Sequence, residues 1–199
     1  SGFSHFEEFE GMVQRLEDKV HTSRTKQRPI IDLEKNELLK GLNFISPFYQ
    51  AILKRNCLRI VYQSFKAKAP STFIFHPYLL KEHRNRWFVL GKKDEREKLM
   101  LLALDRIRKC ETSEEVYEEI AQERLNHYFQ SVIGVTVNEG NAIEQVDLFV
   151  QPQHVPYVLT KPLHHSQEVI EATPQGAHIR LAVRLNFELE KEILAFGEG

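Results

Sequence analysis

The pattern of hydrophobic and polar positions changes its period along the chain, and the changes predict where helices and strands lie. Apolar residues recur every three or four positions between Phe6 and Val20, which predicts an amphipathic helix. The polar stretch 21–29 predicts a linker. Between residues 57 and 110 the apolar runs are short, rich in aromatic and β-branched residues, and separated by charged residues, which is typical of successive antiparallel strands.

The middle of the chain predicts a helix followed by a small sheet. Ser46 is expected to cap the helix, with Pro47 in its first turn. Pro77 is expected to end a strand or lie on an edge, because proline has no N–H to donate to a ladder. Five short, twisted strands tend to close into a small barrel, which removes exposed edges. The predicted strand segments are 30–33, 57–65, 71–76, 79–82, 86–91, 99–104 and 105–110, with a hairpin tip at 83–85.

The last part of the chain predicts a second, smaller unit. Thr112 and Glu115 have the spacing of a capping box, which predicts a helix through Val116 and Ile120. The order β-α-β-β-α that follows is a ferredoxin-like half-sandwich without its final strand. Its free edges are expected at 146–150 and 177–185. Its expected elements are strand 146–150, helix 154–159, strands 168–172 and 177–185, and helix 188–196.

Composition narrows the class of protein. Hydrophobic residues make up 42% and charged residues 28%, which is ordinary for a soluble globular protein. The net charge of −1 means that nucleic acid could bind only through a local basic patch. The sequence has no apolar run long enough for a membrane span. Cys57 and Cys110 lie in apolar, strand-like surroundings and are predicted to be buried free thiols rather than a disulfide, which suits the cytoplasm.

The residues that catalysis needs do not fall into a recognisable arrangement. No pair of histidines has metal-ligand spacing with a matching carboxylate, and the adjacent His164 and His165 would point to opposite faces of a strand. There is no Gly-x-Ser-x-Gly elbow and no glycine-rich phosphate loop. We therefore expect no enzyme, no metal and no cofactor.

Arginines beside aromatic residues are the best candidates for binding. Arg106 and Arg108 are two residues apart and share a strand face, as do Arg86 and Phe88. Planar guanidinium groups beside aromatic rings suit a phosphate that carries a stackable base, as in a nucleotide or single-stranded nucleic acid. Two alternatives remain open: Arg108 as an ordinary surface charge, and an internal ion pair of Asp105 with Arg106.

Aromatic residues of the same region have competing interpretations. His76 and Tyr78 would share a face if their strand continued past Pro77. Phe73, Phe75 and Trp87 lie in dense apolar runs and are expected in the core rather than on a binding platform, with Trp87 largely buried.

Three pieces in order carry a family resemblance. They are the His76-Pro77-Tyr78 step, the run 86–91 that includes Trp87-Phe88-Val89, and Leu104-Asp105-Arg106-Ile107. Together they resemble a WYL domain, a bacterial family that usually follows a DNA-binding helix-turn-helix in transcriptional regulators. The resemblance implies an Sm-like barrel with a helix ahead of it, followed by a C-terminal extension. It implies an α+β protein with a helix and linker at 1–29, a WYL barrel at 30–134 and a ferredoxin-like extension at 135–199.

The resemblance also implies a ligand site. WYL barrels carry a pocket of basic and aromatic residues associated with nucleic-acid-like effectors, and Tyr62, His76, Tyr78 and Arg106 fall on the family pattern. Many members have a further arginine before Leu-Asp-Arg-Ile, but residues 99–103 contain none here. The ligand-binding residues that we expect, from the residues and the resemblance together, are Tyr62, His76, Tyr78, Arg86, Arg106 and Arg108.

The expected function is that of an effector-sensing and oligomerising part of a bacterial transcriptional regulator. The expected effector is a nucleotide or single-stranded nucleic acid, the expected assembly is a homodimer, and duplex DNA would bind through a domain ahead of Ser1. The alternative is a non-catalytic dimerisation or interaction module without a small ligand.

Overall fold

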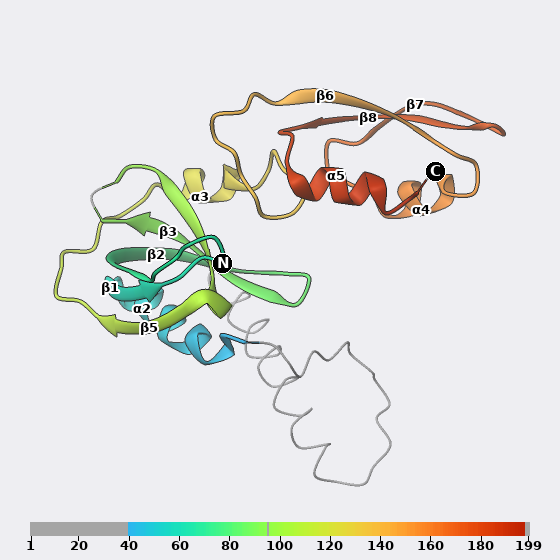
Figure 1. Cartoon of the computed structure of the whole chain (residues 1–199). Coiled ribbons are helices and arrows are strands. Elements are labelled where there is room, and N and C mark those ends of the chain that lie inside the picture. Colours follow the sequence, from blue (N-terminus) through green and yellow to red (C-terminus); the bar gives the residue numbers. More distant parts are fainter. Residues whose placement is uncertain (1–39, 95, 198–199) are drawn as a thin grey trace, which may run out of the picture. The chain divides into compact units, whose positions relative to one another are not determined.

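The computed structural model describes residues 40–94 and 96–197. The helix expected before Val20, the linker 21–29 and the strand 30–33 lie outside the described residues. Figure 1 shows the described helices and strands with their labels, which are used from here on.

The first described helix starts earlier than the sequence predicts. The short 3-10 turn η1 (Leu42–Phe44) leads directly into α2 (Ile45–Lys54). The prediction that Ser46 caps this helix is wrong, because the N-cap position is Phe44 and no side chain caps it. Pro47 does lie in the first turn. Gly41 precedes η1 with φ of 85°, and a Cβ there would lie 2.5 Å from the backbone carbonyl carbon of Leu104. This position therefore needs glycine, both for its left-handed backbone and for its close contact with the later chain.

Five strands form one antiparallel sheet in the order β4-β3-β2-β1-β5. The prediction of a closed barrel is wrong: β4 and β5 are the end strands, and no ladder joins them in the described chain. The 3-10 turn η2 (Leu104–Arg106) stands between these two strands and buries Leu104 fully in the core. The strands are β1 (Leu58–Tyr62), β2 (Ser71–His83), β3 (Arg86–Lys93), β4 (Leu99–Ala103) and β5 (Ile107–Thr112).

Pro77 does not end its strand. β2 runs through it for 13 residues, and Pro77 pairs with Gly91 of β3. The register shifts between Pro77 and Leu79, so a bulge takes up the position where proline cannot donate to the ladder. The hairpin tip falls where it was predicted: Arg84 and Asn85 both have positive φ, as a two-residue primed turn requires.

The core of this sheet consists of large apolar side chains from α2, the strands and η2. Phe48 of α2 and Phe75 of β2 are fully buried, with ring centroids 6.3 Å apart in an edge-to-face arrangement. Trp87 is less buried than predicted and packs at the margin of this cluster. Cys57 and Cys110 are free thiols, buried and half-buried. The buried members of this core are Phe48, Ala51, Leu58, Ile60, Phe73, Phe75, Val89, Leu102, Leu104 and Ile107.

The helix expected after Thr112 does not form there. Thr112 is the last residue of β5, and the next helix, α3 (Gln122–Tyr128), starts only after segment 113–121 has crossed the sheet. Apolar residues of this region still pack together. Tyr117, Ile120, Leu125, Tyr128 and Phe129 contact a second buried cluster of Tyr78, Leu90 and Leu99.

The rest of the described chain forms a three-stranded antiparallel sheet in the order β6-β8-β7. The order of elements is the predicted one, with α4 and α5 on one face of the sheet (Figure 1). The expected free edge at 177–185 is wrong, because β8 lies in the middle and β7 forms the edge beside β8. The elements are β6 (Glu144–Val150), α4 (Val155–Thr160), β7 (Glu168–Thr173), β8 (Gly176–Val183) and α5 (Phe187–Leu194).

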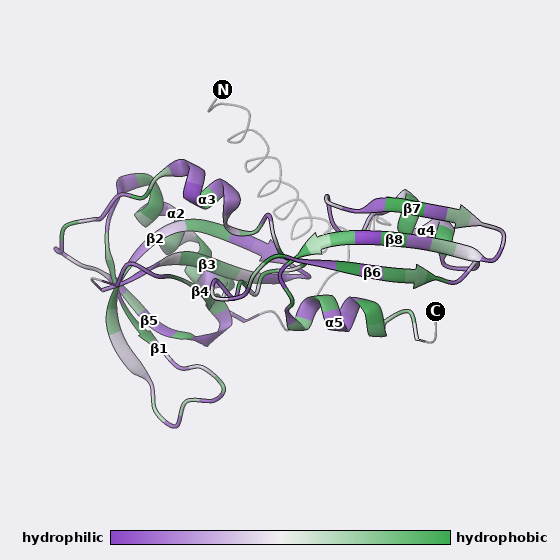
Figure 2. Cartoon of the chain, turned by 90° about the horizontal axis from the view of Figure 1, so that it is seen from above, coloured by the Kyte–Doolittle hydropathy of each residue, from purple (hydrophilic) through white to green (hydrophobic). Residues whose placement is uncertain are grey.

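Residues of β8 and a buried asparagine hold this second unit together. Burial alternates along β8, whereas all of β7 is exposed, and Figure 2 shows hydrophobic and polar residues mixed along α5. Asn186 is only 4% exposed and caps α5 by accepting a hydrogen bond from the Leu189 N–H. Its amide also donates to the carbonyl groups of Ile133 and Thr136 at 2.9 Å, so it ties the preceding loop to the helix.

Candidate ligand-binding site

The side chains expected to bind a ligand fall into two groups in the structure. Tyr62 ends β1 beside Ile107, and Arg106 and Arg108 follow on η2 and β5, so these three lie near one end of the β1–β5 pair. His76 and Tyr78 lie on β2 and are covered by segment 113–121.

Arg86 lies beside the first group because it forms an ion pair with Asp105, the neighbour of Arg106 in the sequence. Its Nε lies 3.5 Å from the Asp105 carboxylate, next to Arg106 in sequence. The alternative of an Asp105–Arg106 ion pair is therefore replaced by an Asp105–Arg86 pair. One oxygen of Asp105 and the Nε of Arg106 are buried without a hydrogen-bond partner in the described residues.

The loop between β1 and β2 completes the first group. The guanidinium of Arg106 lies 4.2 Å from the ring centroid of Phe65, whose side chain is 76% exposed. The backbone N–H of Gln63 donates to the Arg106 carbonyl, and its side-chain oxygen lies 3.5 Å from Arg108. A cation over an exposed aromatic face leaves the other face of the ring open to a flat partner. We call residues Tyr62, Gln63, Phe65, Arg106 and Arg108 the loop site.

The loop site also gathers positive charge. Lys66 and Lys68 follow Phe65 on the same loop and are exposed. Sequence reasoning missed Phe65 and both lysines because Phe65 was placed at the end of the predicted strand 57–65 and the lysines that follow it were given no role.

The second group is closed to solvent. His76 is 4% and Tyr78 7% exposed. The Nδ1 of His76 accepts the Glu118 N–H at 3.1 Å and lies 3.2 Å from the Cys57 sulfur. The Tyr78 hydroxyl donates to the Glu118 carbonyl at 3.0 Å, and the Tyr117 hydroxyl donates to the Pro77 carbonyl at 2.7 Å.

Burial and hydrogen bonding set the protonation states of the titratable side chains in the second group. Burial lowers the pKa of His76, so the imidazole is neutral and its Nδ1 can accept. Burial raises the pKa values of Cys57 and Tyr78, and raises that of Tyr117 to about 12. The hydrogen bond from Lys92 lowers the pKa of Glu118, which forms an ion pair with the Lys92 ammonium. The Cys57 thiol is therefore protonated, which does not suit a nucleophile.

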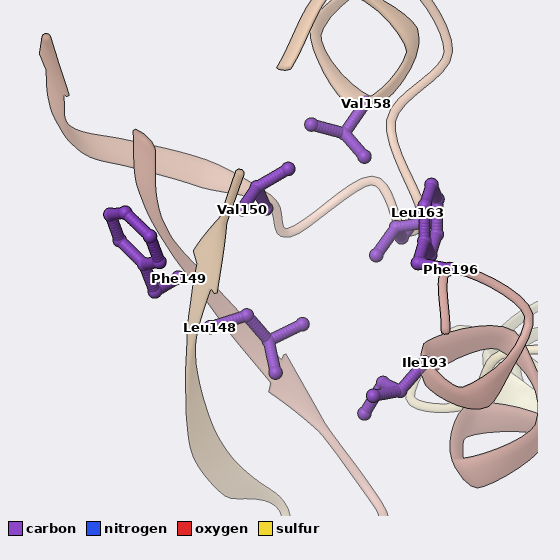
Figure 3. Close-up of a pocket in the computed structure, with 7 residues that line it drawn as sticks. All are labelled: Leu148, Phe149, Val150, Val158, Leu163, Ile193 and Phe196. Atoms are coloured by element: carbon purple, nitrogen blue, oxygen red, sulfur yellow. The ribbon is translucent and has the colours of Figure 1, made fainter. Parts of the chain in front are cut away.

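A separate apolar cavity of about 40 Å³ lies in the second unit, and Figure 3 shows its lining. Val150 points from β6 toward Val158 of α4 and Leu148 points toward Ile193, while the ring of Phe149 lies on the other side of the strand. The cavity is too small for a drug-sized ligand and has no polar group to orient one. It belongs to the core of this unit.

Two further properties bear on function. Within the described ranges, no group of three or more His, Cys, Asp or Glu side chains could hold a metal ion. None of the described helices is long and apolar enough to cross a membrane.

Comparisons with known proteins identify a similarity for the part of the chain that contains the first sheet. Residues 43–112, which contain the first sheet and its preceding helix, match the WYL domain family. Among solved structures, the chain is similar to proteasome accessory factor B/C (PafBC) of Arthrobacter aurescens, with 13% identity and a TM-score of 0.38. That match covers 76% of this chain and only 22% of the PafBC chain. No curated protein sequence matches the chain.

Proposed function

We propose that this WYL domain senses an effector for a bacterial transcriptional regulator, and that the effector is a single-stranded nucleic acid or a nucleotide bound at the loop site. The observation that carries the proposal is the exposed Phe65 ring stacked on the Arg106 guanidinium. Bases stack on such rings whatever their sequence, while the surrounding cations attract phosphates. A protein without catalytic groups, acting by binding alone, is consistent with this arrangement.

Local charge supports the same proposal. Arg106, Arg108, Lys66 and Lys68 contribute four positive charges around Phe65, although the whole chain has a net charge of −1. A local basic patch on a near-neutral protein favours a short anionic ligand over general attraction to nucleic acid.

The strand orders of the two sheets support an Sm-like first sheet and a ferredoxin-like second one. The order β4-β3-β2-β1-β5, with a 3-10 turn before β5, supports an open Sm-like arrangement. The order β6-β8-β7 supports a ferredoxin-like extension, in which a further strand would pair with β6. The free edges of β6 and β7 could pair with a second protomer, so that effector binding would bias the arrangement of a homodimer.

The test is binding of a fluorescently labelled oligothymidine, measured by anisotropy. Phe65→Ala should weaken binding by roughly 1–3 kcal/mol, the usual contribution of one base stacked on an aromatic ring. Arg106→Ala should also weaken binding and should reduce its salt dependence by about one phosphate contact. Because Phe65 is exposed, the loss of affinity in Phe65→Ala should come without a comparable loss of melting temperature.

A control variant separates a specific site from general charge attraction. Lys191 is an exposed cation on α5, in the second unit. Lys191→Gln removes one positive charge, as Arg106→Ala does, and should leave oligothymidine affinity unchanged. If wild-type protein does not bind the oligonucleotide or a competing mononucleotide, the effector proposal is wrong and the interaction-module alternative gains support. Equal losses for Lys191→Gln and Arg106→Ala would show non-specific attraction only.

A further inference from the structure

Segment 113–121, which we call the strap, has a backbone that its own sequence does not favour. Thr112 and Glu115 form a capping-box pattern, and most residues from Glu114 to Ala121 are good helix formers. In the structure the strap has no helix and passes across β2 before α3 begins at Gln122. A conflict between local preference and observed backbone is expected at functional or strained sites.

The contacts of the strap with the sheet involve side chains rather than a backbone ladder. Its first residue, Ser113, donates a backbone hydrogen bond to Cys57. From 114 to 120, no backbone–backbone hydrogen bond of the strap is found in the described part of the chain. The strap is held instead by the side chains of His76 and Tyr78, and by its own Tyr117 hydroxyl bound to Pro77. Its Tyr117 and Ile120 side chains also pack against the buried cluster of Tyr78, Leu90 and Leu99. Without a ladder, it can detach while the sheet stays intact.

Glu118 is the centre of these contacts. Its N–H binds His76, its C=O binds Tyr78, and its carboxylate binds Lys92. The Lys92 side chain is only 15% exposed, and Glu118 is its carboxylate partner among the described residues. An ammonium that loses its carboxylate while it stays buried is destabilised, so an anion that competes with Glu118 for Lys92 would favour release of the strap.

We propose that Glu118 is an internal ligand that keeps the Lys92 site closed, and that an anionic phosphate group binding at Lys92 displaces the strap. The released strap folds as a helix that extends α3 toward its N-terminus, capped by Thr112. This switch does not depend on nucleic acid binding at the loop site, because it uses different residues and its own cation. It connects occupancy of the WYL sheet to the start of the second unit through a change from strap to helix.

The variant Glu118→Lys tests the switch without any ligand. It places a positive charge against Lys92 and keeps a good helix former. Full-length protein should then show 13Cα chemical shifts of residues 113–121 moved downfield, toward helical values. Glu119→Lys is the matched control, because Glu119 is the next strap residue and pairs with the exposed Arg55. It makes the same charge change and should leave the strap shifts extended.

Two further variants test whether the shifts of Glu118→Lys come from a helix, and replace Glu118→Lys if it does not fold. Val116 is 85% exposed and occupies an interior position of the expected helix. Val116→Pro combined with Glu118→Lys should abolish the helical shifts, since proline blocks a helix interior. If Glu118→Lys does not fold, Tyr78→Phe removes one strap hydrogen bond and should move the same shifts in the same direction by less.

The ligand half of the proposal is tested with inorganic phosphate and wild-type protein. Titration should move the resonances of Lys92 and of residues 113–121 together, toward the values of Glu118→Lys, and Lys92→Gln should abolish this response. An extended or disordered strap in Glu118→Lys would overturn the switch. Phosphate shifts confined to the loop site would overturn the displacement step, whereas absent oligothymidine binding would overturn only the function proposed above.

Discussion

At the scale of single residues, the tightest constraint lies where β2 and β3 meet. A Cβ added to Gly91 would lie 2.4 Å from both the His76 carbonyl oxygen and the Phe75 ring. The backbone oxygen cannot move without breaking the ladder beside Pro77. We therefore expect Gly91→Ala to lower the free energy of unfolding by roughly 1–3 kcal/mol, as overpacked cores do. Urea denaturation measures this loss.

Gly140 offers the matched control for this substitution. A Cβ there would meet no atom within 4 Å. Gly140→Ala should change stability by less than about 0.5 kcal/mol, as is usual at the surface. Losses of the same size at both glycines would show that the close packing at Gly91 does not decide the cost.

At the scale of elements, β8 and β7 should differ sharply in protection. β8 is the central strand of its sheet and buries Ile179 and Leu181 completely, whereas every residue of β7 is exposed. Central strands open only with the whole unit, but edge strands fray locally. Amide hydrogen exchange should therefore be slowest in β8 and fastest in β7. Equal protection of β7 and β8 would contradict the observed strand order.

Elements defined by local alternation could be predicted from the sequence. β1 alternates buried Leu58 and Ile60 with exposed Arg59, and the tip at Arg84 and Asn85 lies between two such runs. The wrong predictions fall where distant parts of the chain decide. Pro77 continues its strand because a bulge forms opposite Gly91. The strap is extended because β2 side chains bind it, against its local preference.

For the candidate site too, contacts between residues distant in the sequence could not be predicted from the sequence alone. The two-residue spacing predicted that Arg106 and Arg108 share a strand face, but Arg106 lies in the 3-10 turn η2 and only Arg108 lies on β5. Phe65 could be joined to Arg106 only through the three-dimensional fold, because 41 positions separate the two residues in the sequence. The same holds for Lys92 and Glu118, whose pairing depends on a segment that the sequence assigns to a helix.

At the scale of the whole molecule, one buried and two partly buried histidines should make stability depend on pH. Burial lowers the pKa values of His76, His83 and His164 in the folded protein. The unfolded chain has histidine pKa values near 6.5, so between the folded values and about 6.5 it binds more protons than the folded protein. The stability from these neutral imidazoles is therefore complete above about pH 6.5 and is lost as the pH falls through the folded values.

The contribution of His76 can be isolated because its Nδ1 has a defined role. Protonated Nδ1 would face the Glu118 N–H as a second donor, so acid should loosen the strap and the fold together. His76→Gln removes the titrating group while keeping an acceptor for that N–H. Urea unfolding midpoints compared near pH 7.5 and pH 5.5 should fall less in His76→Gln than in the wild type. An unchanged difference would show that His83, His164 or other groups carry the acid sensitivity, and that His76 does not link proton uptake to the strap.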